Sequence, residues 1–201
     1  MSTLFICLFW VALTYVIGSL PFGLIVSKLS TGQDPRSSGS RNTGATNIAR
    51  TCGLRYGLLT FLLDMAKGFI PLILAMTLSD SLLFLSLTGL AAIVGHMYSV
   101  FLNGRGGKGV ATTIGVFAAL TPSPLFWSLV ICLFIIWFTG YVAAGSLALC
   151  LALPILLILS FNLSFFLLSL AVMFLVFFKH QDNIIRLARG RENNWRMRPA
   201  S

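Results

Sequence analysis

The chain has 201 residues, of which 57% are hydrophobic and only 9% are charged. This composition excludes an ordinary soluble domain and indicates an integral membrane protein. The formal net charge of +9 would suggest a nucleic-acid partner in a soluble protein. Here, however, thirteen of the fourteen Lys and Arg residues fall in three segments outside the long apolar runs: Lys28 to Arg55, Arg105 to Lys108 and Lys179 to Arg198. Such clusters are typical of positive-inside topology, so membrane lipid rather than nucleic acid is the expected partner.

The apolar runs predict an all-α membrane protein of seven transmembrane helices, with short or re-entrant elements, that forms a single domain over residues 1–201. The first run lacks the basic start of a cleaved signal peptide, so we expect it to remain as a helix. Gly18, Pro21 and Gly23 should bend its second half. The expected helices are Leu4 to Leu29, Leu58 to Leu78, Leu82 to Leu102, Val110 to Leu120, two helices within Leu125 to Ser160 that divide at Thr139-Gly140, and Leu163 to Phe178.

The run from Val110 to Leu120 is unusually short. Its 11 residues rise about 16 Å, roughly half the thickness of a bilayer core. A short helix of this kind, starting at a polar loop, resembles the half-helices whose N-termini face substrates in transporters.

An odd number of helices places all three basic segments on one side of the membrane. The N-terminus is then outside and the C-terminus cytoplasmic. Asp80, the turn from Thr121 to Pro124, and Asn162 fall on the outer side.

The segment from Gly95 to Thr112 contains a glycine loop, Asn103 to Gly109, between two apolar runs. Four glycines allow the backbone to turn tightly and to approach a ligand closely. Amide groups at the start of a helix, together with Arg105 and Lys108, suit an anion. The loop therefore predicts a phosphate site at a membrane surface. The alternative is a flexible loop whose two cations only satisfy the positive-inside rule.

Two nucleotide-binding motifs are only superficially matched here. Gly104, Gly106 and Gly109 fit G-x-G-x-x-G, but that motif follows a strand in a βαβ unit, whereas this segment follows a membrane-length apolar run. A phosphate-binding P-loop would need a glycine at Leu102 and a hydroxyl residue at Gly109. Neither nucleotide motif is therefore predicted.

The loop from Arg36 to Arg50 has hydroxyl, carboxamide and guanidinium groups and no acidic residue. This composition suits a phosphorylated polar molecule held by many hydrogen bonds. The alternative is an ordinary solvated loop. The many small residues favour a compact re-entrant element, which needs protein or water around it at membrane depth.

Several further residues are ionisable or share a helical face. His180, Asn183 and Arg186 are spaced three residues apart and would lie on one side of a helix, although a lone histidine at a helix end is more often interfacial than catalytic. Asp64 and Lys67 lie within an expected transmembrane helix, where ionisable residues are functional by default. A self-neutralising structural pair is an equally good interpretation. The other acidic residues are scattered, so no metal site and no cofactor are expected.

Four segments resemble the bacterial acyl-phosphate-dependent glycerol-3-phosphate acyltransferases (the PlsY family), in the family's order and spacing and over nearly the whole chain. Arg41 stands where a glycine is expected, and Gln181-Asp182 stands where Arg-Glu is usual. The segments that carry the resemblance are Gly18 to Gly23 (GSLPFG), Gly39 to Arg50 (GSRNTGATNIAR), Gly95 to Thr112 (GHMYSVFLNGRGGKGVAT), and Asn183 to Gly190.

The resemblance implies transfer of a fatty acyl group from acyl phosphate to the 1-hydroxyl of sn-glycerol 3-phosphate, giving lysophosphatidate for phospholipid biosynthesis. It also implies a bacterial inner-membrane location, a cytoplasmic active site, and possible contact with the soluble enzyme that makes acyl phosphate. The phosphates would be held through the first loop and the glycine loop, and His180 and Asn183 would orient the attacking hydroxyl. Carried over by matching motif positions, the expected catalytic residues are Ser40, Lys108, His180 and Asn183, and the expected substrate-binding residues are Asn42, Thr46, Asn47, Arg50, Ser146 and, through their amides, Gly106 and Gly107.

The H-x4-D pair of other glycerol phosphate acyltransferases is absent, because Phe101 and Ile185 stand five places after the two histidines, His96 and His180. A small transporter of an anionic phosphorylated metabolite is the main rival function. The expected helices are nearly free of polar groups and show no internal repeat, which disfavours it. A purely structural membrane protein would leave the polar loops unexplained.

The topology can be tested with reporter fusions. A reporter after Ser201 should behave as cytoplasmic, and a reporter near Asp80 should behave as external, because the positive-inside rule fixes the orientation. Finding Arg41 and Arg105 on opposite sides of the membrane would contradict the predicted arrangement.

Overall fold

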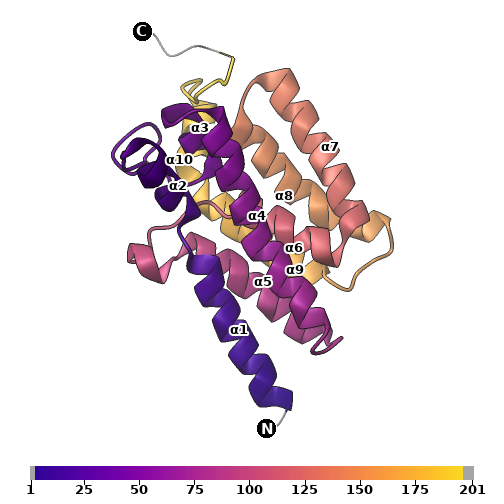
Figure 1. Cartoon of the computed structure of the whole chain (residues 1–201). Helices are drawn as coiled ribbons and strands as arrows, with labels where there is room; N and C mark the ends of the chain where they lie inside the picture. The colour runs from indigo at the N-terminus through magenta and orange to yellow at the C-terminus, as the bar shows by residue number, and fades with distance from the viewer. Residues whose placement is uncertain (1–2, 197–201) are drawn as a thin grey trace. The chain divides into compact units, whose positions relative to one another are not determined.

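The computed structural model describes residues 3–196, which are helices joined by loops, with no strand in that range (Figure 1). The last residues of the predicted basic tail, including Arg198, lie outside the described part. The elements are α1 Thr3–Ser19, α2 Phe22–Thr31, α3 Ala45–Thr51, α4 Leu54–Met76, α5 Leu82–Met97, a 3₁₀ turn η1 Val100–Leu102, α6 Val110–Leu120, α7 Pro122–Thr139, α8 Val142–Leu159, α9 Phe166–Lys179 and α10 Gln181–Ala188.

The predicted all-α membrane fold is confirmed. In the described part, five helical segments are long and apolar enough to cross a membrane, or six if the pair α9 and α10, bent by 63°, counts as one. The remaining apolar helix, α6, is the short element that the sequence predicted, so the seven apolar segments are not seven full-length spans. The orientation of the termini stays a prediction.

The helices group into two compact units, one up to Leu120 and one from Thr121 onward. That both act as one acyltransferase domain stays a prediction. Helix α4 is the centre of the first unit, where it packs against α1, α2, α3, α5 and α6.

The contact between α4 and α6 depends on glycines from both helices. A Cβ atom at Gly68 would collide with the backbone carbonyl of Thr112, and one at Gly115 would collide with the carbonyl of Met65. Small residues of this kind let helix backbones approach closely where lipid provides no hydrophobic drive for association. The short helix α6 is therefore held directly against α4.

Helices α1 and α5 meet in the same way, through Gly18 against Ala92 and Gly95 against Tyr15. The first helix then ends at Ser19, and α2 begins at Phe22. The expected bend is thus a complete break around Leu20 and Pro21, because Pro21 has no N–H group to continue a helical ladder.

In the second unit, α8 packs between α7 and α9, and α10 contacts both α8 and α9. The chain after α10 returns to the turn between α7 and α8. There the Asn194 side chain donates to the carbonyl of Thr139 (3.2 Å), and the Trp195 N–H donates to that of Gly140 (3.0 Å). These bonds fix the described part of the tail to the end of α7.

Candidate functional site

In the first unit, the loop before α3 is organised by Asn47, whose side chain is 2% exposed. Its Oδ1 accepts the N–H of Ser40 (2.8 Å). Its Nδ2 donates to the carbonyls of Pro35 (2.9 Å), Ser38 (3.2 Å) and Asn42 (2.9 Å). The carboxamide thus replaces the backbone pairing that this irregular segment lacks. Asn47 holds the loop in shape, whereas a direct phosphate contact by it stays a prediction.

The other predicted residues of this loop lie on its outer side. Ser40, Thr46 and Arg50 are exposed, and Asn42 is half-buried with its Oδ1 accepting the Gly44 N–H (2.8 Å). The loop therefore presents a hydroxyl, a guanidinium and amide groups to whatever lies outside it.

The backbone conformation of Arg41 accounts for its position where the family pattern has a glycine. Its φ is +56°, in the left-handed region that favours glycine. A glycine at this position would thus adopt the same backbone without strain.

An ion pair closes the start of the loop. The Arg36 guanidinium donates to the Asp34 carboxylate (2.7 Å), and this lowers the pKa of Asp34 to about 2. The pair lies at the surface, so it contributes little to stability. The pair nevertheless gives Arg36, the first cation of the loop, a partner within the chain.

The glycine loop folds back onto the end of α5. The N–H of Gly106 donates to the carbonyl of Met97 (3.2 Å), and the N–H of Gly107 donates to that of His96 (3.0 Å). The two amides thus bind oxygen atoms of the chain itself, and their expected contact with a phosphate stays a prediction. The residues must still be glycine, since Cβ atoms there would collide with His96.

Lys108 is half-buried and stands directly before the start of α6. Gly109 makes this start possible, because its φ is +85° and its carbonyl accepts the first helical bond, from the Thr113 N–H (2.8 Å). The first amides of a helix have no intrahelical partner and attract anions. That Lys108 and the N-terminus of α6 together form the expected anion site stays a prediction.

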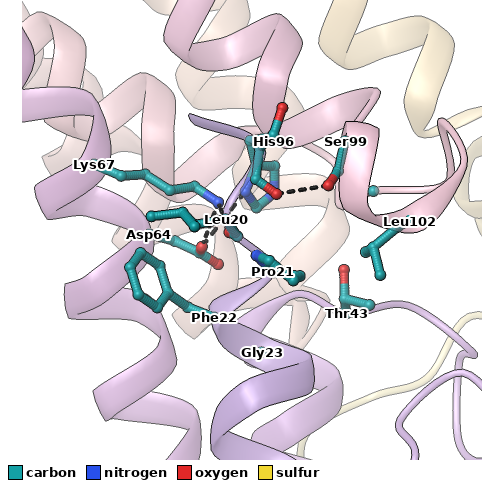
Figure 2. A pocket seen from close by; sticks show the side chains of 12 residues that line it. Leu20, Pro21, Phe22, Gly23, Thr43, Asp64, Lys67, His96, Ser99 and Leu102 are labelled. Atoms are coloured by element: carbon teal, nitrogen blue, oxygen red, sulfur yellow. Dashed lines mark hydrogen bonds and ion pairs between the residues drawn. The ribbon is translucent and has the colours of Figure 1, made fainter. Parts of the chain in front are cut away.

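A small recess lies beside this loop in the first unit (Figure 2). Asp64, Lys67 and His96 converge in it. The Lys67 Nζ is 2.9 Å from Asp64 Oδ1, and His96 Nδ1 is 3.5 Å from the same oxygen. The complete lining is Ser19, Leu20, Pro21, Phe22, Gly23, Thr43, Asp64, Lys67, His96, Ser99, Leu102 and Gly106.

The sequence had marked Asp64 and Lys67 as a pair but had assigned no role to His96. The position of His96 at the end of an apolar run was the available signal. Its contact with Asp64 joins two different helices, so spacing along the chain could not reveal it.

In the second unit, two of the three residues predicted to share a helical face, Asn183 and Arg186, lie in α10 and bind the same partner, whereas His180 precedes the helix. Asn183 is 5% exposed and donates to Glu192 Oε1 (2.9 Å), while Arg186 donates to Glu192 Oε2 (2.8 Å). Glu192 lies beyond the helix and was not anticipated. It orients the carboxamide of Asn183 through the described part of the tail.

His180 stands at the bend between α9 and α10 and is 3% exposed. Its Nδ1 lies 2.8 Å from the carbonyl of Val176, which leaves Nε2 directed away from that carbonyl. Ser146 is also buried, and its hydroxyl donates to the Val142 carbonyl one turn earlier in α8 (2.9 Å).

The predicted residues are therefore divided between the units. The loop residues and Lys108 belong to the first unit, and Ser146, His180 and Asn183 belong to the second. Within the described residues, no group of three or more His, Cys, Asp or Glu side chains is placed to hold a metal ion.

Comparison with known proteins identifies the family. Residues 8–190 match the family described as glycerol-3-phosphate acyltransferase. The chain belongs to this family. A glycerol-3-phosphate acyltransferase of Solidesulfovibrio magneticus is 52% identical over 189 residues, covering 93% of this chain and 94% of that protein. Another, of Nitratidesulfovibrio vulgaris, is 51% identical over 188 residues, covering 94% of this chain but 58% of that protein.

Two crystal structures of PlsY, an integral membrane glycerol 3-phosphate acyltransferase, are also similar. The glycerol 3-phosphate form has a TM-score of 0.89 and 39% sequence identity. The lysophosphatidic acid form has a TM-score of 0.86 and 37% identity. Each comparison covers 94% of both chains.

The role of Asn47 can be tested through stability. Asn47→Asp replaces a group that donates to three carbonyls with a charged acceptor, so it should cost about 2 kcal/mol or more. For a chain of this size the unfolding midpoint in detergent should fall by roughly 4 °C or more. The control is Asn162→Asp at an exposed turn, which should leave the midpoint unchanged. Equal unfolding midpoints for both variants would contradict the role of Asn47 as the residue that organises the loop.

Proposed function

We propose that the protein transfers a fatty acyl group from acyl phosphate to the 1-hydroxyl of sn-glycerol 3-phosphate, giving lysophosphatidate and inorganic phosphate. The family match over residues 8–190 supports glycerol 3-phosphate as the acceptor. The similar PlsY structures in glycerol 3-phosphate and lysophosphatidic acid forms support the same acceptor and product. The observation that carries the proposal is Lys108, half-buried at the N-terminus of a short apolar helix. A cation there can meet a phosphate beside an acyl chain.

The proposed reaction is a direct acyl transfer. The 1-hydroxyl oxygen attacks the carbonyl carbon of the acyl phosphate, the bond from that carbon to the phosphate oxygen breaks, and phosphate leaves with the electron pair. The hydroxyl proton passes to a phosphate oxygen of the substrates. Because acyl phosphate is already activated, the protein has mainly to position the reactants and to stabilise charge.

The residue roles follow from this chemistry. In the first unit, Lys108 and Arg50 would neutralise phosphate, with Ser40, Asn42 and Thr46 donating hydrogen bonds to it. Asn47 would act mainly by shaping the loop.

In the second unit, His180 and Asn183 would orient the attacking hydroxyl, and Ser146 would line the substrate site. Glu192 would hold Asn183 in its orientation. We place the site at the cytoplasmic face of a bacterial inner membrane, where the basic loops are expected and where a soluble enzyme could deliver acyl phosphate.

The donor and metal requirements provide a first test. Purified protein should form lysophosphatidate from acyl phosphate and glycerol 3-phosphate, strongly prefer acyl phosphate to acyl-CoA, and remain active with EDTA. The reason is that a phosphate leaving group matches the cationic loops, and no acidic cluster is expected to hold Mg²⁺. Equal use of acyl-CoA, or an absolute requirement for Mg²⁺, would contradict the proposal.

A second test concerns Lys108. Lys108→Ala should lower kcat by about 10²–10³-fold, roughly 3–4 kcal/mol, because it removes a charge-assisted contact where charge develops on the leaving phosphate. Lys108→Arg should recover little, since a planar guanidinium does not replace a compact ammonium in a tight loop. Turnover is measured at matched unfolding midpoints.

Arg105→Ala is the matched control for Lys108→Ala. Arg105 belongs to the same glycine loop but is exposed, so its loss should have a clearly milder effect. A Lys108→Ala protein within about threefold of wild type would place the phosphate elsewhere.

A further inference from the structure

A buried ionic cluster in the first unit has no place in the proposed substrate contacts. Asp64 and Lys67 lie in α4 and His96 lies in α5, and they are 2%, 4% and 7% exposed. Burying charges in a membrane protein is costly, and such groups are retained where they serve a function. The question is whether the cluster does more than neutralise itself.

One end of the cluster binds the break in the first apolar segment. The Lys67 Nζ donates to the carbonyl of Leu20 (2.8 Å). Leu20 lies between α1 and α2, where the regular helical bonding of the backbone is interrupted. Lys67 thus fixes this break to α4. The Asp64 carboxylate, whose Oδ1 is 2.9 Å from the Lys67 Nζ, compensates the charge of the ammonium.

The other end of the cluster supports the glycine loop. His96 faces Asp64 through Nδ1 (3.5 Å), while its backbone carbonyl accepts the N–H of Gly107 (3.0 Å). A Cβ atom at Gly107 would collide with the imidazole Nε2, and one at Gly106 would collide with the His96 carbonyl oxygen. The loop therefore lies against both the ring and the backbone of His96.

Lys108 immediately follows the glycine that touches this imidazole. A rotation of the His96 ring would push on Gly107 and hence displace the backbone that carries Lys108. Contact with Asp64 restrains that rotation. The chain of contacts runs from the α1–α2 break through Lys67, Asp64 and His96 (Figure 2). From His96 it continues to the glycine loop.

We propose that Asp64, Lys67 and His96 form a positioning network that holds the glycine loop in the conformation in which Lys108 meets the phosphate of acyl phosphate. This inference rests on the proposed function for the identity of the ligand. The three residues are positioning residues, because they act through the loop.

A self-neutralising pair and a positioning network respond differently when both charges are removed. A buried ion pair that only neutralises itself can be replaced by apolar residues of similar size with little loss, whereas removing one partner leaves an uncompensated charge. The double variant Asp64→Leu/Lys67→Met therefore separates the two roles. It avoids a lone buried charge but removes the contacts to Leu20 and His96.

The experiment compares this double variant with wild type and with Asp64→Leu alone, as purified protein in lipid nanodiscs. We expect the double variant to unfold near the wild-type midpoint, and the single variant to unfold well below it. The KM of the double variant for acyl phosphate should rise about tenfold or more, with a smaller change in kcat, because the loop that carries Lys108 is less well placed before chemistry begins. A double variant with wild-type KM and kcat would contradict the positioning role and show that Asp64 and Lys67 form only a structural pair.

Substitutions at His96 provide an independent test of its contact with Asp64. His96→Asn keeps a nitrogen near the position of Nδ1 and should retain much of the wild-type KM, whereas His96→Leu should resemble the double variant. Thr88→Val is the control, since it removes a fully buried hydroxyl from the same helix and should leave KM unchanged. Equal KM values for the Asn and Leu variants would overturn the role of the Asp64 contact.

Hydrogen exchange tests the network without reference to activity. The Gly106 and Gly107 amides are bonded to α5, so a peptide covering this loop should exchange slowly in wild type and at least about tenfold faster in the double variant. Unchanged exchange would refute the network even if the enzyme were active. A wild-type protein that makes no lysophosphatidate would instead refute the proposed function, while faster loop exchange would still support the network.

Discussion

The first unit depends on one constraint. The polar backbone groups at two interruptions of its apolar helices must find hydrogen-bond partners within the protein. In a bilayer, a carbonyl or N–H group without a partner is costly, so irregular backbone must be satisfied by the protein itself. At the α1–α2 break, the Lys67 ammonium binds the carbonyl of Leu20 and the Ser99 hydroxyl binds that of Ser19 (2.6 Å). At the second interruption, the glycine loop bonds back to the end of α5. Both interruptions are therefore tied to the helices beside them.

These ties require close approach between helices, which explains the distribution of glycine. Helix α4 meets α6 through Gly68 and Gly115, and α1 meets α5 through Gly18 and Gly95. Larger residues would separate the helices and lengthen the contacts at the interruptions. The packing of small residues within the apolar part and the shape of the polar loops are thus parts of one arrangement, and that arrangement sets where Lys108 lies.

Local signals in the sequence predicted the features that depend on local chemistry. Apolar runs predicted the helices, Pro21 predicted a bend where the structure has a break, the short run predicted α6, and three-residue spacing brought Asn183 and Arg186 together in α10. The sequence did not predict features that join distant segments. Glu192 binding Asn183, and His96 meeting Asp64, involve residues that no spacing rule connects.

The chain contacts of the Gly106 and Gly107 amides were not predicted, because a glycine-rich loop looks alike in sequence whether its N–H groups face a ligand or the chain. Asn47 shows the same limit. Its residue type suits a phosphate contact, but its burial and four hydrogen bonds, known only from the structure, give it the task of shaping the loop.

The proposed chemistry asks little of the protein beyond placement, because the energy for acyl transfer is already present in the acyl phosphate. Its central claim is that the acyl group passes directly to glycerol 3-phosphate and never to a side chain such as Ser40. The most direct measurement is intact-protein mass spectrometry of enzyme quenched within milliseconds of mixing with acyl phosphate, before and after glycerol 3-phosphate is added. The account predicts the unmodified mass at every time while lysophosphatidate accumulates. A species heavier by one acyl group, formed without glycerol 3-phosphate and discharged by it at the rate of turnover, would contradict the account.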